Sequence, residues 1–510
     1  MLSLSSNIAI ASEKPRIVTW WLLSTLLGIG TLIRIPQLHH SLYESSQPDL
    51  GYSFRQTQTA FVIQKYATDG IDLLSTPLPL FGRSSNVPME FPLFQALGAF
   101  LMHTGLDSDV ASRLLGLVSF QVSGLLLALI LLRWHGRMVA LIAIALFEFL
   151  PFGLSWGAAS LIDFFSVALA LAMVYFLDRW FSGGSTVTLL AGSLAAVLAF
   201  LVKATTAPSW SLLLLASAAM VIHRIGWRVC LKRLLLGFAL GPGLGLVAAT
   251  IWTAYADSIK KQNPLTGFLT SSALSDWNFG TLAERMDPRV YLTIVDGVIV
   301  HIAGPGMLAL WLGVLAAKFL PSRTQRLSTW GWLLVSISGP LIFLNLYLIH
   351  TYYLIAIYPA LVTMMAIGIV WVARLLTGRR WPRIVAVVVG VVAVVAATLV
   401  SPEARTDIAG LFHGDPVPTS SIGIRDFTPR NSRIIMIGCD WDPTVLYYAQ
   451  REGVMFRDAT PGSFWETERI ADYPFLFSCT GGLNPEQWLP PGYTAVATST
   501  EGLYRVIRKT

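Results

Sequence analysis

Charged residues are scarce in this sequence. They make up 13% of the 510 residues, whereas about a quarter of the residues in ordinary soluble proteins are charged. Hydrophobic residues account for 54%, and the mean hydropathy is +0.62. Because a water-soluble globule cannot bury that much apolar surface, the composition excludes a soluble enzyme and a disordered regulator. It indicates a polytopic membrane protein.

Cysteine is also rare, with three residues in the whole chain. Three cysteines exclude a disulfide scaffold, and the sequence contains neither an H-E-x-x-H nor a C-x-x-C pattern. A dedicated zinc site is therefore unsupported, and metal dependence stays open. The net charge of +7 sits at the ends of apolar segments rather than on a soluble face. This placement indicates orientation in a membrane and argues against a nucleic-acid partner.

Apolar runs of near-membrane length recur along the first 400 residues and predict about eleven transmembrane helices. The run after Lys14 and Arg16 lacks a convincing cleavage site, so we expect an uncleaved anchor rather than a signal peptide. The predicted spans are 17–35, 109–132, 138–151, 160–177, 187–202, 207–222, 234–254, 291–317, 328–348, 352–373 and 384–400.

Basic residues alternate between the two sides of these spans. With the N-terminus in the cytoplasm, the inside segments hold sixteen Lys and Arg residues, whereas the short outside loops hold only Lys203. The positive-inside rule predicts this asymmetry. We therefore expect a multi-pass protein of the plasma (inner) membrane, with a cytoplasmic N-terminus and an extracytoplasmic C-terminus.

Two long loops, 36–108 and 255–290, and a tail, 401–510, then fall outside. The tail combines a strand-like stretch at 433–438, a helix-like stretch at 444–453 and a final alternating stretch, which predicts a small α/β domain. We accordingly divide the chain into a transmembrane domain over 1–400 and an extracytoplasmic domain over 401–510. Cys439 and Cys479 both lie in the tail, where they form either a disulfide or two buried thiols.

The first outside loop carries several candidate site residues. Residues 54–67 and 91–103 have near-helical spacing of apolar residues, which predicts amphipathic helices on the membrane surface. Asp49 precedes the first of them and could act as a general base or simply cap a turn. Arg55 could pair with Asp49 or a phosphate, or extend along the membrane interface. Glu90 lies between two prolines.

Ionisable residues border the outer ends of four spans, where burial in lipid would be costly. They are Glu148, Asp163, Lys203 and His350, and the last is followed by Tyr352. Each has a plain alternative, such as a lysine contacting lipid headgroups or a histidine packed on Tyr352. Together they predict an outward-facing cavity with acids for catalysis and cations for a phosphate.

The order of these motifs resembles that of membrane glycosyltransferases of the GT-C superfamily. The closest branch is glycosyltransferase family 39, with protein O-mannosyltransferases and the aminoarabinose transferase of lipid A. The resemblance rests on Asp49 before SFRQTQTA, EFPLFQ at 90–95, Asp163, VKAT around Lys203, and HTYYLIAIYP at 350–359. One departure is that Leu50 follows Asp49, where family members often have paired Asp-Glu.

That resemblance implies a GT-C-like helical membrane domain and transfer of a sugar from a polyprenyl-phosphate donor, with inversion, to an envelope acceptor outside the membrane. It implies Asp49 as base and Glu90 and Asp163 in the acceptor or donor pocket. The departing phosphate would contact Arg55, Lys203, His350 and Tyr352. No cofactor is firmly implied, and neither the sugar nor the acceptor follows from the sequence.

Two other functions remain open. A secondary transporter usually shows repeated halves and ionisable groups at mid-membrane, and the sequence has no visible repeat. A non-catalytic protein that binds a lipid-linked sugar, or assembles an envelope complex, would share all the features above.

Overall fold

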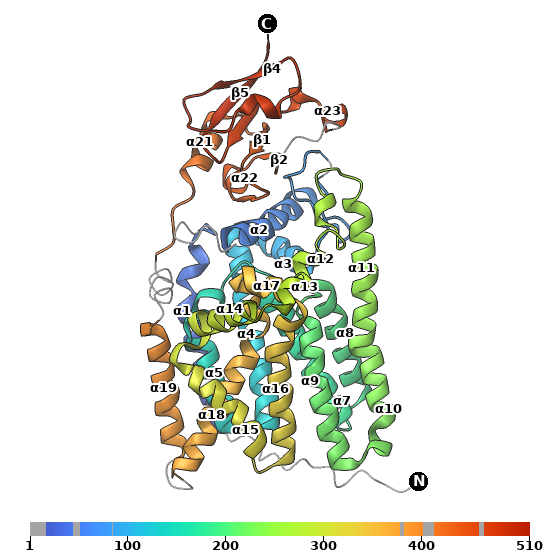
Figure 1. Cartoon of the computed structure of the whole chain (residues 1–510), viewed down its shortest axis with the longest axis vertical. Coiled ribbons are helices and arrows are strands. Elements are labelled where there is room, and N and C mark those ends of the chain that lie inside the picture. Colours follow the sequence, from blue (N-terminus) through green and yellow to red (C-terminus); the bar gives the residue numbers. More distant parts are fainter. Residues whose placement is uncertain are drawn as a thin grey trace. The chain divides into compact units, whose positions relative to one another are not determined.

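The computed structural model describes residues 17–43, 52–83, 85–377, 382–400, 413–457 and 464–509. The chain folds into two compact units (Figure 1). The helical unit comprises 17–37, 116–249 and 277–400, and the mixed unit comprises 38–115, 250–276 and 413–509, within the described residues. The first long loop and residues 255–276 of the second thus group with the tail, whereas the predicted division at residue 400 grouped both loops with the spans.

Helices occupy all eleven predicted apolar ranges. Six of the described helices are long and apolar enough to cross a membrane, and a seventh span would be the pair Pro288–Ala303 and Met307–Phe319, bent by 109°. The count of eleven is not confirmed, because α5 has 13 residues and α8 has 17, below the roughly 20 that cross a bilayer. A polytopic helical membrane protein is confirmed.

The main helices are, in chain order, α1 (Ile17–Arg34), α4 (Ser108–Trp134), α5 (Arg137–Phe149), α6 (Pro151–Trp156), α7 (Asp163–Phe181), α8 (Thr186–Val202), α9 (Ala207–Ile225), α10 (Trp227–Phe238), α11 (Leu244–Lys260), α12 (Ser275–Phe279), α13 (Leu282–Met286), α14 (Pro288–Val298), α15 (Met307–Phe319), α16 (Arg323–Ile342), α17 (Leu344–Ile349), α18 (Tyr358–Thr377) and α19 (Pro382–Val400). In the helical unit, α7 to α10 lie side by side, α9 packs on α16, and α18 lies among α5, α15, α16 and α19 (Figure 1).

Small residues bring helices α15 and α18 close together at their backbones. A Cβ on Gly313 would lie 2.1 Å from the carbonyl oxygen of Met364, and one on Gly368 would lie 2.1 Å from that of Ala309. Close approach through glycine is a common way for helices to associate in lipid, where no hydrophobic effect drives them together. Substitution of either glycine would push these two helices apart.

The glycine-rich stretch 237–245 serves both close packing and kinking. A π-helical turn, η3 (Ala239–Gly243), contains Pro242 and joins α10 to α11. Proline removes a backbone donor and opens the helix at this point. A Cβ on Gly237 would lie 2.3 Å from the Phe181 ring, so this glycine lets the helix approach α7.

The mixed unit contains a five-stranded sheet in the order β2-β1-β3-β5-β4. β1 pairs in parallel with β2 and β3, whereas β5 runs antiparallel to β3 and β4, which confirms a small C-terminal sheet domain. The helix predicted over 444–453 is too long, because Gln450 takes a left-handed conformation and ends it. The elements are α2 (Tyr52–Asp69), α3 (Leu93–Met102), α21 (Thr419–Phe427), β1 (Arg433–Ile437), α22 (Thr444–Ala449), β2 (Glu452–Phe456), α23 (Phe464–Thr467), β3 (Phe475–Ser478), β4 (Tyr493–Ala497) and β5 (Leu503–Arg508).

The first loop shares one hydrophobic core with this sheet. Phe61 and Tyr66 of α2 are buried in the cluster that holds the strand residues Ile435 and Val454. The segment 79–82 adds antiparallel backbone hydrogen bonds to the edge strand β2, which covers an edge that would otherwise be free to pair with another chain. The apolar face predicted to lie on the membrane therefore packs in the protein for α2, whereas α3 keeps Phe100 67% exposed.

The disulfide alternative is also settled. Cys439 and Cys479 are bonded, and each follows one of the paired parallel strands β1 and β3. The bond ties together the ends of two adjacent strands. Cys230 is a buried free thiol.

Candidate functional site

The candidate site in the helical unit is centred on Asp163 and Lys203. Asp163 is the first residue of α7, and Lys203 directly follows the last residue of α8. The short connection between the two helices makes them antiparallel neighbours. The start of one therefore lies beside the end of the other, which brings together two residues 40 positions apart.

The two side chains form an ion pair that is buried from solvent. Lys203 Nζ donates to Asp163 Oδ1, and each side chain is only 3% exposed. An ammonium group has three donors, and this hydrogen bond uses one of them. The ammonium group also lies close to two aromatic rings.

These two rings, which form the aromatic wall of the site, come from the 3₁₀ helix η7 (Thr351–Ala356), directly after His350. Lys203 Nζ lies 4.6 Å from the ring centroid of Tyr353 and 5.4 Å from that of Tyr352. A cation over an aromatic face is stabilised by the ring quadrupole, more strongly when it is desolvated. The Tyr352 ring also stacks on His350, with centroids 5.3 Å apart.

The structure therefore brings together four of the predicted residues, Asp163, Lys203, His350 and Tyr352. Sequence reasoning missed two aromatic neighbours, Trp156 and Trp277. Their rings lie 6.3 Å from Tyr352 and 5.8 Å from His350 respectively. Only the general enrichment of aromatics near a membrane interface could have signalled them. The resulting cluster offers one cation, one acid and several ring faces.

Glu148 belongs to a different cluster. Its carboxylate accepts a 2.9 Å hydrogen bond from Arg34, and both side chains are fully buried. Arg34 also donates to the carbonyl oxygens of Gly30, Glu148 and Gly153. A Cβ on Gly157 would lie 2.3 Å from Arg34 Nε, so small residues make room for the guanidinium.

The two charges of this second cluster, Arg34 and Glu148, pair with each other. Arg34 stands over the Phe120 ring at 4.3 Å, and Gln121 also donates to Glu148. Nothing in the local sequence signals the pairing, because Arg34 and Glu148 are 114 residues apart and each ends an apolar run. We interpret the cluster as structural, because it holds α1, α4, α5 and α6 together.

The mixed unit holds the candidates from the first loop. Arg55 donates hydrogen bonds to Glu90 at 2.9 Å and to Gln58 at 2.5 Å. The predicted site residues Arg55 and Glu90 therefore contact each other. The pair is partly exposed, with side-chain exposures of 15% and 25%. Asp49, the predicted base, lies outside the described residues.

A further polar cluster in the mixed unit was not anticipated from the sequence. Asp109 accepts hydrogen bonds from the hydroxyl groups of Tyr447 and Tyr448. Burial raises the pKa of both phenols, and the negative charge of Asp109 raises it further. Both phenols therefore remain protonated donors. No sequence signal links residues more than 300 positions apart.

No metal centre emerges from the part of the chain that the structure describes. Within those residues, no group of three or more His, Cys, Asp or Glu side chains could hold a metal ion.

Similarity to known proteins is visible in structure rather than in sequence. No protein-family model matches the chain, and no curated protein sequence matches it. Solved structures do match. ArnT from Cupriavidus metallidurans in the apo state superposes with a TM-score of 0.60 at 14% identity, covering 96% of this chain and 98% of that one.

Two further matches hold lipid phosphates. ArnT from the same organism bound to undecaprenyl phosphate gives a TM-score of 0.58 at 13% identity, over 96% of this chain and 97% of that one. The oligosaccharyltransferase AglB from Archaeoglobus fulgidus, in complex with an inhibitory peptide and a dolichol-phosphate, gives a TM-score of 0.55 at 12% identity. The match covers 91% of this chain and 70% of that one. At these identities the likeness concerns the fold, and it confirms the GT-C-like architecture expected from the motifs.

Proposed function

We propose that this protein is an inverting glycosyltransferase that moves a sugar from a polyprenyl-phosphate donor to an acceptor of the cell envelope. The observation that carries the proposal is the buried Asp163–Lys203 pair against the Tyr352–Tyr353 wall. It occurs in a chain that shares its fold with proteins bound to undecaprenyl phosphate and dolichol-phosphate. A lipid phosphate is therefore the ligand class that best suits Lys203.

The chemistry of such a transfer needs two things from the protein. As the bond between the anomeric carbon and the donor phosphate breaks, negative charge grows on the phosphate oxygens. A fixed cation in a dry site stabilises that charge far more than it would in water. Lys203 is such a cation, and Asp163 fixes its position by accepting one of its hydrogen bonds.

The acceptor must also lose a proton as it attacks the anomeric carbon from the face opposite the phosphate. We propose Asp49 as the general base because the sequence around it resembles that of GT-C glycosyltransferases. Arg55 and Glu90 contact each other, and we assign them to the donor phosphate and the acceptor side respectively. His350 and Tyr352 complete the wall near Lys203 and contribute donors for the phosphate.

The proposed setting is the plasma membrane of a bacterium, with the N-terminus in the cytoplasm and the mixed unit outside. The alternation of basic residues supports this orientation. The acceptor is a lipid, glycan or protein of the envelope.

The test is turnover of a radiolabelled polyprenyl-phosphate sugar by the purified full-length protein in lipid nanodiscs, supplied with envelope extract as acceptor. We expect release of polyprenyl phosphate coupled to labelled acceptor. The matched control for a Lys203→Met variant is Lys318→Met, which removes an exposed lysine of α15 and should leave turnover unchanged.

Donor binding should be measured in parallel with turnover. Binding without turnover would support the non-catalytic alternative, a protein that holds a lipid-linked sugar. Failure to bind the donor at all would overturn the proposed site at Lys203.

A further inference from the structure

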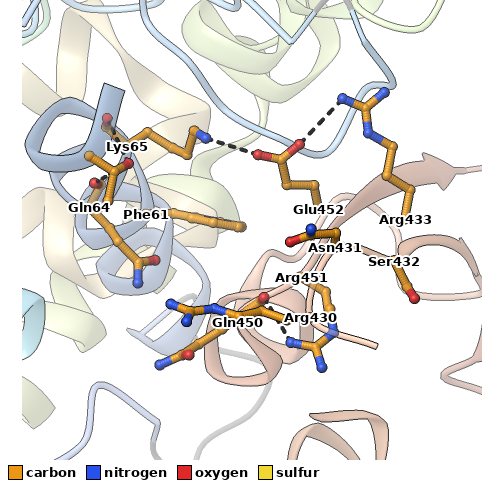
Figure 2. A pocket seen from close by; sticks show the side chains of 11 residues that line it. Phe61, Gln64, Lys65, Arg430, Asn431, Ser432, Arg433, Gln450, Arg451 and Glu452 are labelled. Atoms are coloured by element: carbon orange, nitrogen blue, oxygen red, sulfur yellow. Dashed lines mark hydrogen bonds and ion pairs between the residues drawn. The ribbon is translucent and has the colours of Figure 1, made fainter. Parts of the chain in front are cut away.

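A polar cavity of about 520 Å³ lies in the mixed unit, where α2 meets the edge strand β2 and the segment 430–433 (Figure 2). Four cations line it, namely Lys65, Arg430, Arg433 and Arg451, and Glu452 is the only acid among its described lining residues. Cavities that bind small ligands are typically about 300–1,000 Å³. The size therefore suits a ligand, and the charge favours an anion.

The single acid is already occupied. Glu452 accepts from Lys65 at 2.9 Å and from Arg433 at 3.4 Å, so it bridges the two cations, as Figure 2 shows. Lys65 is held additionally by Asp69 at 2.6 Å. Arg430 is exposed and makes no ion pair with any residue that the structure describes. Positive charge thus remains uncompensated on this side of the cavity.

Arg451 adds a buried charge to the same side. It is 5% exposed, and its guanidinium donates to four main-chain carbonyl oxygens and to the hydroxyl of Thr428. It has no carboxylate partner among the described residues. Burial lowers its pKa, and the positive charges of Arg430 and Arg425 lower it further. An anion bound in the cavity beside Arg430 and Arg451 would relieve their mutual repulsion.

The cavity also carries side chains that can both donate and accept hydrogen bonds. Gln64, Asn431 and Gln450 supply amide groups, and amides match the hydroxyl groups of sugars because both partners donate and accept. Gln450 has a φ of +53° at the end of α22, a conformation that favours glycine there. Gln450 therefore carries a backbone cost that glycine would avoid, and its side chain lines the cavity.

Two neighbouring cavities extend the first. One, of about 660 Å³, shares Asn431, Ser432 and Arg433 with it and is also lined by Arg83 and Asp472. Another, of about 270 Å³, shares Gln64 and Gln450 and is also lined by Arg425, Asp107 and Asp109. The first cavity therefore adjoins both of the others. Adjoining cavities suit a chain of several sugars better than a compact ion.

We infer that these adjoining cavities, here called the groove, bind an anionic oligosaccharide. The carboxylate or phosphate groups of the ligand would bind Arg430 and Arg433, and its hydroxyl groups would bind the amides of Gln64, Asn431 and Gln450. Arginine recognises both kinds of anion through paired, charge-assisted hydrogen bonds. If the proposed transferase activity holds, the ligand of the groove is the acceptor, and the acceptor is an acidic glycan segment of the envelope. The acceptor role rests on that proposed function, whereas glycan binding does not.

The test measures binding without donor or turnover. The full-length protein, in nanodiscs of neutral phosphatidylcholine, is titrated into fluorescently labelled tetragalacturonate and followed by anisotropy. Maltotetraose serves as the neutral competitor and inorganic phosphate as the free-anion competitor. We expect unlabelled tetragalacturonate to compete at least tenfold better than either, because both charge and length should contribute.

Two variants locate the binding. Arg430→Gln should weaken binding by roughly tenfold or more, the effect expected for loss of hydrogen bonds to a charged group. Gln450→Gly should weaken it by roughly two- to tenfold without lowering the Tm, because glycine relieves the left-handed backbone. Arg508→Gln, which removes an exposed arginine at the end of β5, is the matched control and should bind as the wild type does.

Three results would overturn the inference. Equal competition by maltotetraose would remove the role of charge, and equal competition by inorganic phosphate would reduce the groove to a simple anion site. Unchanged binding in Arg430→Gln would place the glycan elsewhere. A protein that binds tetragalacturonate but never turns over the lipid donor would refute the proposed transferase function and leave this inference standing.

Discussion

Lys203 and Asp163 form an ion pair in which each side chain is only 3% exposed, with the lysine ammonium also over the ring of Tyr353. A buried pair of this kind is costly to desolvate and is weak evidence for stability by itself. Its location at the ends of two neighbouring helices, near the rings of Tyr352 and Tyr353, is the reason why we propose a functional role. Comparing single and double substitutions can separate the two roles.

Replacement of Lys203 by Met should destabilise the protein by roughly 3–5 kcal/mol, because Asp163 would be left buried without a partner. The double variant Lys203→Met with Asp163→Leu should recover much of that loss, since no isolated charge remains. Thermal unfolding in detergent measures both. Donor binding should be lost in both, and a double variant that binds donor normally would exclude Lys203 from the phosphate site.

Asp49→Asn should lower turnover by about 10²–10⁴-fold, the usual contribution of a general base. Expression and donor binding should stay normal, because asparagine keeps the size of the side chain and loses only its ability to take a proton. Glu44→Gln is the neighbouring control and should be nearly silent. If Asp49→Asn stays within about threefold of wild type while Glu90→Gln or Asp163→Asn abolishes turnover, the base is one of those acids.

The orientation of the chain can be tested by thiol labelling of intact spheroplasts. Asp415→Cys should react with an impermeant maleimide, whereas Gly378→Cys should be protected. The background should be low because Cys439 and Cys479 are bonded and Cys230 is buried. The reverse pattern would mean that the number of spans before the tail is off by one.

Loss of the disulfide should destabilise the mixed unit. Cys439→Ala with Cys479→Ala opens a loop with a sequence separation of 40, which corresponds to a loss of about 2–4 kcal/mol. Circular dichroism of the full-length protein with and without reductant would measure the shift in Tm. The Tm of Cys230→Ala should still fall when reductant is added. A wild-type Tm that does not change with reductant would contradict the prediction.

Arg34→Lys should lower the Tm while activity per folded molecule is retained. Lysine keeps the charge near Glu148, but it cannot donate at once to the carbonyl oxygens of Gly30, Glu148 and Gly153 as arginine does. Buried acceptors left unpaired cost about 1–3 kcal/mol each. A loss of turnover at unchanged stability would instead place Arg34 in the catalytic machinery.

Much of the architecture was decided by local sequence alone. Long apolar runs have no stable alternative to a helix in lipid, because every backbone group must be satisfied within the segment. The helices therefore lie where the hydropathy placed them, and the strand at 433–437 follows from its own apolar residues. Helix ends were less certain, and the turn at Gln450 shortened one predicted helix by several residues.

The pairing of distant groups was decided only by tertiary structure. Sequence position predicted that Glu148, Asp163, Lys203 and His350 border the same side of the spans, but not that Glu148 pairs with Arg34 and Asp163 with Lys203. Likewise, periodicity made α2 amphipathic without showing that its apolar face meets the sheet. Hydropathy is a property of neighbouring residues, whereas a partner 40 or 114 positions away is chosen by helix packing, for which no single segment holds the information.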